Sequence, residues 1–236
     1  MPDRSLASRL ASKVPGYRAL HLALDFVRGR EQRNSALLRL RDQAGLFQPF
    51  GTTREDRYPG IFSFLQDALG ADSDLRLLSF GCSTGEEVRS LARRFPNATI
   101  KGLDISPERI AQCRASCVDD RTTFEVADTT AAEGDARYDV VFAMAVFRDP
   151  RLGKRKADDR RIRAFAKFEL AVADLARTVK PGGYLALRHA NFNFTDTAAS
   201  NGFDRVQQAP NKTAKFDRAG KPLLAQGMEG TVFRKR

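Results

Sequence analysis

The stretch that decides the fold is LRLLSFGCSTG, residues 75–85. Its first six residues are mostly apolar, which is typical of a short buried strand, and the strand stops at Gly81. A helical pattern begins at Gly85, so a strand, a glycine turn and a helix follow one another directly. Such a turn lets the backbone approach a ligand closely and directs the N–H groups of a helix N-terminus towards it. The stretch therefore predicts a ligand-binding turn at the end of a buried strand.

Short apolar strands alternate with helical segments along the rest of the chain. This alternation is typical of βαβ units and predicts an α/β fold with a mostly parallel sheet. The last two segments are expected to close the sheet as an antiparallel pair. The predicted strands are residues 75–80, 98–103, 122–126, 138–146, 184–189, 203–207 and 230–233.

The chain before this sheet has a different pattern. Residues 4–46 show apolar side chains at helical spacing, and a Pro/Gly-rich loop follows over residues 48–60. Another short helix is predicted at residues 61–69. We therefore expect a helical N-terminal extension over residues 1–70, serving as a lid, and a ligand-binding catalytic domain over residues 71–236.

Composition excludes several classes of protein. With 42% hydrophobic and 29% charged residues the chain is typical of a globular protein, and no apolar run is long enough to span a membrane. Three cysteines and two histidines are too few for a disulfide framework or a zinc site, so we expect no metal and a cytoplasmic setting.

The net charge of +11 is unevenly distributed. Residues 51–147 carry a net charge of −5, and the segments on either side are basic. A nucleic-acid-binding protein usually has a focused basic stripe with interleaved aromatic residues. Because the excess is spread over several segments, we interpret it as solvated surface and expect no nucleic-acid partner.

The acidic residues beside the glycine turn indicate the class of ligand. Asp104 ends the second strand, where a carboxylate can accept hydrogen bonds from both hydroxyls of a ribose. Glu86 and Glu87 begin the helix, and two carboxylates there would repel a pyrophosphate but favour a cation. S-adenosylmethionine carries a sulfonium and an ammonium group, so it fits this pattern where NAD or FAD does not.

Five motifs follow one another in order: LSFGCSTG at 78–85, GLDIS at 102–106, VAD at 126–128, YDVVF at 138–142 and VKPGGYL at 179–185. Together they resemble a class I S-adenosylmethionine-dependent methyltransferase. The resemblance implies a Rossmann-like sheet of seven strands with helices on both faces, and S-adenosylmethionine as the cofactor. The cofactor-binding residues that it implies are Phe80, Gly81, Cys82, Ser83, Thr84, Gly85, Asp104, Ile105, Asp128, Thr129 and Ala143.

The sequence departs at two places from the motifs of known methyltransferase groups, and these departures bear on the class of substrate. Ser79 stands where this family usually has an acidic residue, and the first motif is similar to that of chemotaxis-receptor methyltransferases, which methylate protein glutamates. Those enzymes carry an Arg-Asn pair where this chain has Met144 and Ala145. The Asn/Asp-Pro-Pro motif of nucleic-acid amino-methyltransferases is also replaced, by residues 143–147. Protein carboxyl methylation and RNA methylation are therefore kept only as alternatives.

Three residues are candidates for the chemistry. His189 ends the fifth strand, where it can serve as a general base near its unperturbed pKa, in packing, or in substrate hydrogen bonding. Tyr58 lies in the loop before the first strand and is a candidate lid residue, with Phe62 expected to line the pocket beside it. Asn191 places its amide on one face of an extended segment.

The predicted function is methyl transfer from S-adenosylmethionine to an oxygen or nitrogen of a small molecule. Such a displacement depends on alignment more than on acid–base catalysis. Two alternatives stay open: an enzyme that transfers or cyclises the aminobutyryl chain with release of methylthioadenosine, and a cofactor-binding module without turnover. The oligomeric state is not predicted.

Overall fold

The computed structural model describes residues 29–40, 46–48, 50–117, 119–149, 152, 159–223 and 227–236. Helix α3, Arg30–Leu40, belongs to a different compact unit from the sheet, and each unit is described by itself. The helices predicted for residues 4–28 lie outside the described residues. The expected domain boundary at residue 70 and the lid role of the extension stay predictions.

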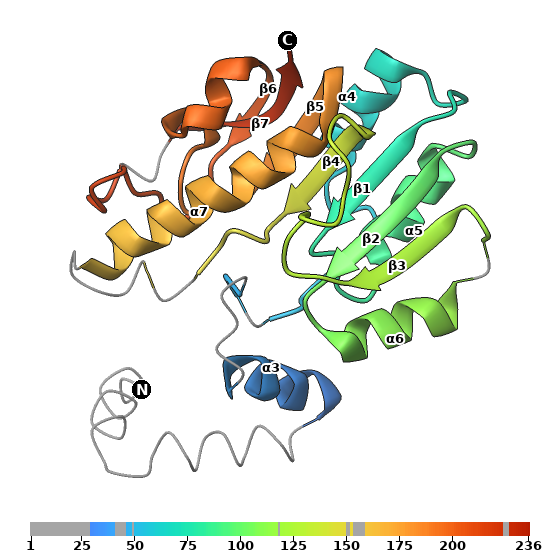
Figure 1. Cartoon of the computed structure of the whole chain (residues 1–236), viewed down its shortest axis with the longest axis horizontal. Helices are drawn as coiled ribbons and strands as arrows, with labels where there is room; N and C mark the ends of the chain where they lie inside the picture. The colour runs from blue at the N-terminus through green and yellow to red at the C-terminus, as the bar shows by residue number, and fades with distance from the viewer. Residues whose placement is uncertain are drawn as a thin grey trace, which may run out of the picture. The chain divides into compact units, whose positions relative to one another are not determined.

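A seven-stranded sheet forms the centre of the second unit, in the order β3-β2-β1-β4-β5-β7-β6 (Figure 1). Strands β1 to β5 are parallel, and β7 pairs antiparallel with both β5 and β6. This confirms the predicted mostly parallel sheet and its antiparallel closure. The strands are β1 (Arg76–Phe80), β2 (Thr99–Asp104), β3 (Thr122–Val126), β4 (Tyr138–Met144), β5 (Val179–Arg188), β6 (Phe203–Pro210) and β7 (Met228–Lys235).

Strand β5 begins earlier than the sequence pattern predicted. Val179 already pairs with Tyr138, and the next pair joins Tyr184 to Val140, so β5 takes the extra residues as a bulge. The Pro-Gly-Gly segment, which precedes the predicted strand at residues 184–189, is therefore part of the observed strand. The bulge accommodates a proline, which has no N–H to donate to a regular ladder.

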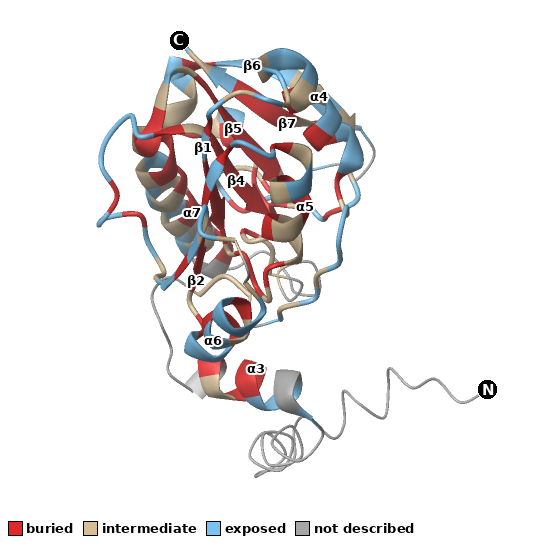
Figure 2. Ribbon diagram, turned by 90° about the vertical axis from the view of Figure 1, so that its right-hand side faces the viewer, coloured by how far each residue is buried: buried red, intermediate tan, exposed pale blue. Residues whose placement is uncertain are grey.

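Helices cover both faces of the sheet, as predicted (Figure 1). One hydrophobic cluster joins three helices to one face of the sheet, and a second cluster joins α7 to the other. Figure 2 shows the buried strands between helices whose outer sides are exposed. The helices are α4 (Pro59–Leu69), α5 (Glu86–Arg94), α6 (Pro107–Ser116) and α7 (Asp159–Thr178).

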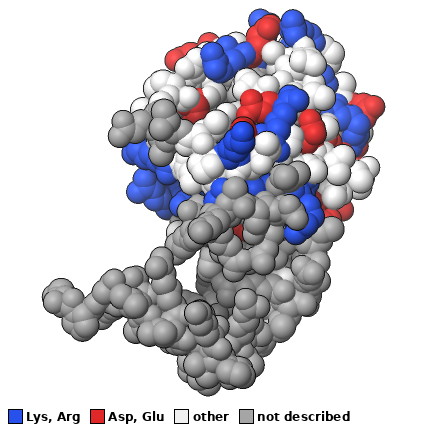
Figure 3. Space-filling model, turned by 90° about the vertical axis from the view of Figure 1, so that its left-hand side faces the viewer, with Lys and Arg blue, Asp and Glu red and all other residues white. Residues whose placement is uncertain are grey.

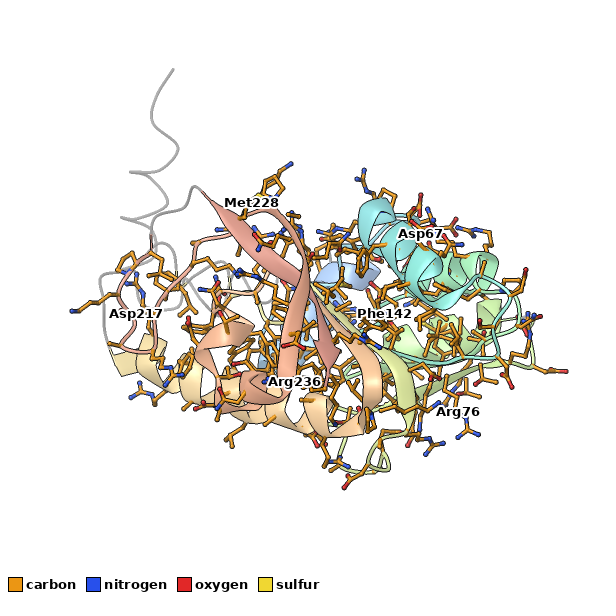
Figure 4. All side chains as sticks on the ribbon, turned by 90° about the horizontal axis from the view of Figure 1, so that it is seen from above. Asp67, Arg76, Phe142, Asp217, Met228 and Arg236 are labelled. Carbon is orange, nitrogen blue, oxygen red and sulfur yellow. The ribbon has the colours of Figure 1, made fainter. Side chains whose placement is uncertain are left out.

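Helix α4 packs on the sheet through its apolar side. The ring of Phe62 meets that of Phe142 edge-on, with 5.9 Å between centroids. Figure 4 shows Phe142 in the interior below this helix, which carries Asp67 on its outer side. Phe62 is 1% exposed, so it belongs to the core and does not line a pocket as expected. The contacts group α4 with the sheet.

The charged side chains of one face are shown in Figure 3, where Lys and Arg form several separate groups with Asp and Glu between them. A single basic stripe is not visible on that face. In the part of the chain that the structure describes, no helix is both long and apolar enough to cross a membrane.

Candidate cofactor and acceptor site

The predicted site residues gather at one edge of the sheet. Parallel strands end at the same edge, and ligands of open α/β sheets bind in the crevice outside those carboxyl ends. Gly81 follows β1, Asp104 ends β2, Asp128 lies just after β3, and His189 follows β5. The fold thus brings together residues that are up to about a hundred positions apart in the chain.

Two glycines shape the turn after β1. Gly81 has φ +76°, and a Cβ there would lie 2.4 Å from Cγ2 of Val146, so only glycine fits. Its N–H donates to the carbonyl of Leu103 at 2.7 Å, which fixes the turn to strand β2. Gly85 is the N-cap of α5 with φ +88°, the left-handed region that favours glycine. The turn therefore leads directly into the N-terminus of α5, as predicted.

Asp104 organises the same turn from strand β2. Its carboxylate accepts hydrogen bonds from the backbone N–H of Ser83 and of Ser106, both at 2.9 Å, and Arg109 lies 3.8 Å away. Asp104 is 5% exposed. Asp104 therefore ties the end of strand β2 to the glycine turn and to the segment that begins α6.

The other residues of the glycine turn form hydrogen bonds with neighbouring protein groups. The hydroxyl of Thr84 donates to the carboxylate of Glu86, with distances of 2.7 and 2.9 Å to its two oxygens. Ser83 has φ +53°, and its carbonyl accepts from the thiol of Cys113 at 3.2 Å. Cys82 is buried in the core, and its N–H donates to Leu103. The turn therefore offers a ligand mainly its backbone.

Glu87 is a candidate that the sequence analysis noted without assigning a role. Its carboxylate accepts a 2.8 Å hydrogen bond from the hydroxyl of Ser79, which is fully buried in β1. Burial raises the pKa of Glu87 to about 7, although the bond from Ser79 and the charge of Arg57 lower it. The signal in the sequence was the polar Ser79 in a central strand, because a buried hydroxyl needs a partner.

The remaining predicted cofactor residues differ in exposure. Phe80 packs in the core beside Phe147, and the methyl group of Ala143 is 1% exposed in the same cluster, so both can meet a ligand only through the backbone. Ile105 and Asp128 are half-buried, and Thr129 is exposed. These three lie at the edge where β2 and β3 end.

Tyr58 is buried at the N-terminus of α4. Its ring lies 5.8 Å from that of His189, and Arg57 lies over its face at 5.3 Å. The hydroxyl is buried without a hydrogen-bond partner among the described residues. Burial raises its pKa to about 12, so the hydroxyl is protonated and can donate. A buried hydroxyl without a partner is uncommon, and this one lies beside His189 near the carboxyl edge of the sheet.

His189 has φ +56°, which turns the chain sharply after β5. Its Nδ1 lies 3.1 Å from the hydroxyl of Thr213. Burial, followed by the charge of Arg188, lowers its pKa to about 4, so the ring is neutral at physiological pH. This environment fits hydrogen bonding or packing against Tyr58 better than a base near its unperturbed pKa, and the catalytic role of His189 stays a prediction.

Asn191 connects two loops. Its Oδ1 accepts from the N–H of Asp149 at 2.5 Å, and its Nδ2 donates to the carbonyl of Ala214 at 2.9 Å. The side chain is 2% exposed, with both ends of the amide engaged. Asn191 thus positions the segments beside His189, and this arrangement does not present its amide to an acceptor.

Comparison with known proteins agrees with this geometry. Residues 77–183 match the protein family described as Methyltransferase domain. Malonyl-[acyl-carrier protein] O-methyltransferase of Acetivibrio thermocellus is 36% identical over 35% of this chain and 30% of its own length. Trans-aconitate 2-methyltransferase of Deinococcus radiodurans is 29% identical over 55% of this chain and 45% of its own length.

The chain therefore spans less than half the length of these relatives. Among solved structures, the MccD protein aligns with a TM-score of 0.50 at 12% identity, covering 78% of this chain and all of that one. This likeness concerns the fold alone. Residues 77–183 are thus similar to a methyltransferase domain, and they lie within a Rossmann-like sheet.

Proposed function

We propose that the chain transfers the methyl group of S-adenosylmethionine to an oxygen or nitrogen of a small molecule. The observation that carries the proposal is the half-buried carboxylate of Glu87 beside the glycine turn, with Asp104 and Asp128 along the same edge. Three acidic groups around one crevice favour a cationic ligand over a pyrophosphate. The residues present therefore fit S-adenosylmethionine.

Each acidic group has its own role in this proposal. Glu87 pairs with the ammonium group, Asp104 accepts from the ribose hydroxyls, and Asp128 accepts from the adenine amino group. The backbone of residues 81–85 lies against the rest of the cofactor. When bound, S-adenosylmethionine supplies an electrophilic methyl group on a sulfonium that is already a good leaving group. The protein's part is to align the acceptor with it and to exclude water.

Among oxygen and nitrogen acceptors, a carboxylate oxygen fits this site best. It carries no proton that a base must remove, and His189 has its pKa lowered to about 4 by burial. The hydroxyl of Tyr58 can donate a hydrogen bond to such an oxygen, because it has no partner among the described residues. The relatives named above are named for malonyl and trans-aconitate substrates, both of which contain carboxylates.

The test is to incubate the full chain with S-adenosylmethionine and a panel of mono-, di- and tricarboxylates, and to identify the products by mass spectrometry. S-adenosylhomocysteine together with a methyl ester supports the proposal. Methylthioadenosine supports use of the aminobutyryl chain instead. Cofactor binding without any product supports a binding module, and methylation of added protein or RNA supports the remaining alternatives.

A further inference from the structure

The loop after strand β4 carries an arginine at the carboxyl edge of the sheet. Arg148 lies four residues beyond the end of β4 and is half-buried. Strand β4 lies beside β5 (Figure 1), and the two chains stay joined beyond the strands. The N–H of Ala145 donates to the carbonyl of Arg188 at 2.8 Å. The N–H of Asn191 donates to the carbonyl of Phe147 at 2.9 Å, so the loop is fixed to the segment that follows β5.

The same loop packs against the glycine turn. A Cβ on Gly81 would lie 2.4 Å from Cγ2 of Val146, which precedes Arg148 by two residues. On the other side of Arg148, the N–H of Asp149 donates to Oδ1 of Asn191 at 2.5 Å. Arg148 therefore lies between two anchored residues, in a loop that contacts both the turn after β1 and the segment after β5.

The charge of Arg148 acts on the two side chains that face the acceptor side of the site. Burial raises the pKa of Tyr58 to about 12, and the charge of Arg148 is among those that oppose this rise. Burial lowers the pKa of His189 to about 4, and positive charges, that of Arg148 among them, lower it further. The rings of Tyr58 and His189 are themselves 5.8 Å apart. Arg148 is thus close enough to both rings for its charge to be felt.

Three arginines act on both rings, and they differ in their protein partners. Arg188 bonds the carboxylate of Glu229. Nη1 of Arg57 donates to the carbonyl of Thr52 at 2.8 Å. Arg148 forms no hydrogen bond or ion pair with any residue that the structure describes. A half-buried guanidinium without a protein acceptor favours an anionic ligand beside it.

We propose that Arg148 binds the acceptor group of the substrate, a carboxylate held between this guanidinium and the hydroxyl of Tyr58. The inference rests on the proposed function and names the residue that selects the charge of the acceptor. The hydroxyl of Tyr58 is buried without a partner among the described residues, so two donors face a group that only accepts. A methyl ester is neutral, so Arg148 holds the acid more tightly than the methylated product.

Calorimetry on the full chain, saturated with S-adenosylhomocysteine, tests this role. The probes are malonate, succinate and trans-aconitate, with their fully methylated esters as neutral controls. We expect at least one acid to bind more tightly than its ester. Arg148→Gln should weaken that binding about tenfold or more, the loss expected for a hydrogen bond between charged groups. Arg148→Lys keeps the charge and should recover part of the loss. Arg76→Gln is the matched control, since Arg76 is exposed and begins β1 at the opposite edge of the sheet.

A second readout reports the place of binding. The chain has two histidines, His21 and His189, so a His189→Gln variant assigns the proton resonances of the His189 ring. Addition of the acid should shift these resonances in the wild type, and by less in Arg148→Gln at the same concentration. Because Arg148 has no partner among the described residues, Arg148→Gln should melt at the same temperature as the wild type.

Equal affinity for acid and ester in the wild type, or an acid affinity unchanged in Arg148→Gln, would overturn the role of Arg148. Failure of the proposed function is a different result: no S-adenosylhomocysteine is formed from S-adenosylmethionine with any carboxylate. If Arg148→Gln forms methyl esters with the KM of the wild type, the proposed function stands and the role of Arg148 does not.

Discussion

The hydroxyl of Ser79 in strand β1 donates a 2.8 Å hydrogen bond to Oε1 of Glu87, the second residue of helix α5. Ser79 is fully buried and Glu87 is half-buried. Class I S-adenosylmethionine-dependent methyltransferases, which the five motifs together resemble, usually have an acidic residue where Ser79 stands. Here the serine instead holds a carboxylate that comes from the helix. The fold thus retains a carboxyl group behind the turn, although the acidic residue of the strand is absent.

Glu87→Gln should weaken S-adenosylmethionine binding and stabilise the protein without ligand. The pKa of Glu87 is raised from 4.5 to about 7, so the folded state holds its proton more tightly than the unfolded state. Stability is therefore lost as the pH rises from about 4.5 through 7. Above pH 7 the ionised group costs about 3 kcal/mol, most of which the neutral amide avoids.

Thermal melts at pH 5 and pH 8 measure the stability effect, and calorimetry measures cofactor affinity. The melting temperature of Glu87→Gln should exceed that of the wild type at pH 8 by more than at pH 5. Asp67→Asn, on the exposed side of α4, is the control and should change neither quantity. Undiminished cofactor affinity in Glu87→Gln would remove Glu87 from the site.

Asp104→Ala should weaken S-adenosylmethionine binding by about 1.5–3 kcal/mol, the loss expected for hydrogen bonds to a charged acceptor. It should also destabilise the turn, because the N–H groups of Ser83 and Ser106 lose their acceptor. Asp104→Asn keeps the shape of the side chain and separates the two effects. If calorimetry on the folded Asn variant gives wild-type affinity, the ribose assignment is wrong. Asp119→Asn, at a surface turn, serves as the control.

Tyr58→Phe should raise stability and lower turnover. Removing a buried hydroxyl that lacks a partner among the described residues relieves about 1–2 kcal/mol of desolvation. Tyr138→Phe is the contrasting variant, because that hydroxyl donates to Glu133 and its loss should cost about 1–2 kcal/mol. Denaturant melts compare the two, and a steady-state assay measures turnover. Full turnover in Tyr58→Phe would show that the hydroxyl does not contact the acceptor.

His189 should not impose a pH dependence on kcat between about pH 5.5 and 8. Its pKa is lowered to about 4, so the ring stays neutral throughout this range. The unfolded chain takes up a proton on His189 near pH 6.5, whereas the folded chain does so only near pH 4. The contribution of His189 to stability is therefore lost as the pH falls from 6.5 towards 4. The measurement is a kcat profile at saturating cofactor. A limb near pH 6.5 that disappears in His189→Gln would identify a general base after all.

Duplex and single-stranded RNA should bind only in the micromolar range and with steep salt dependence, as expected for non-specific contact. The basis is the distribution of the +11 net charge, which includes a segment of net −5. Fluorescence anisotropy at several salt concentrations measures this binding. Nanomolar, sequence-selective binding at physiological salt would contradict the small-molecule proposal.

The succession of strands along the chain and the glycine turn could be predicted from the sequence because both depend on local patterns. The run from Leu75 to Phe80 has the apolar character of a buried strand, and Gly81 and Gly85 mark positions that need positive φ. Asp104 was predictable for the same reason, since the end of a short apolar strand is visible in the sequence. The Pro-Gly-Gly bulge of β5 was not, because it depends on pairing with β4.

What only the tertiary structure decided is the environment of each polar group. The sequence alone predicted that Glu87, His189 and Tyr58 lie near the carboxyl edge of the sheet. Their pKa values, however, are shifted because residues distant in the chain bury them. Likewise, the amide of Asn191 joins two loops because it bonds the backbone of Asp149 and of Ala214, which lie 42 and 23 positions away in the chain. Local patterning specifies the elements of a fold, whereas desolvation and hydrogen-bond partners are set by packing between elements.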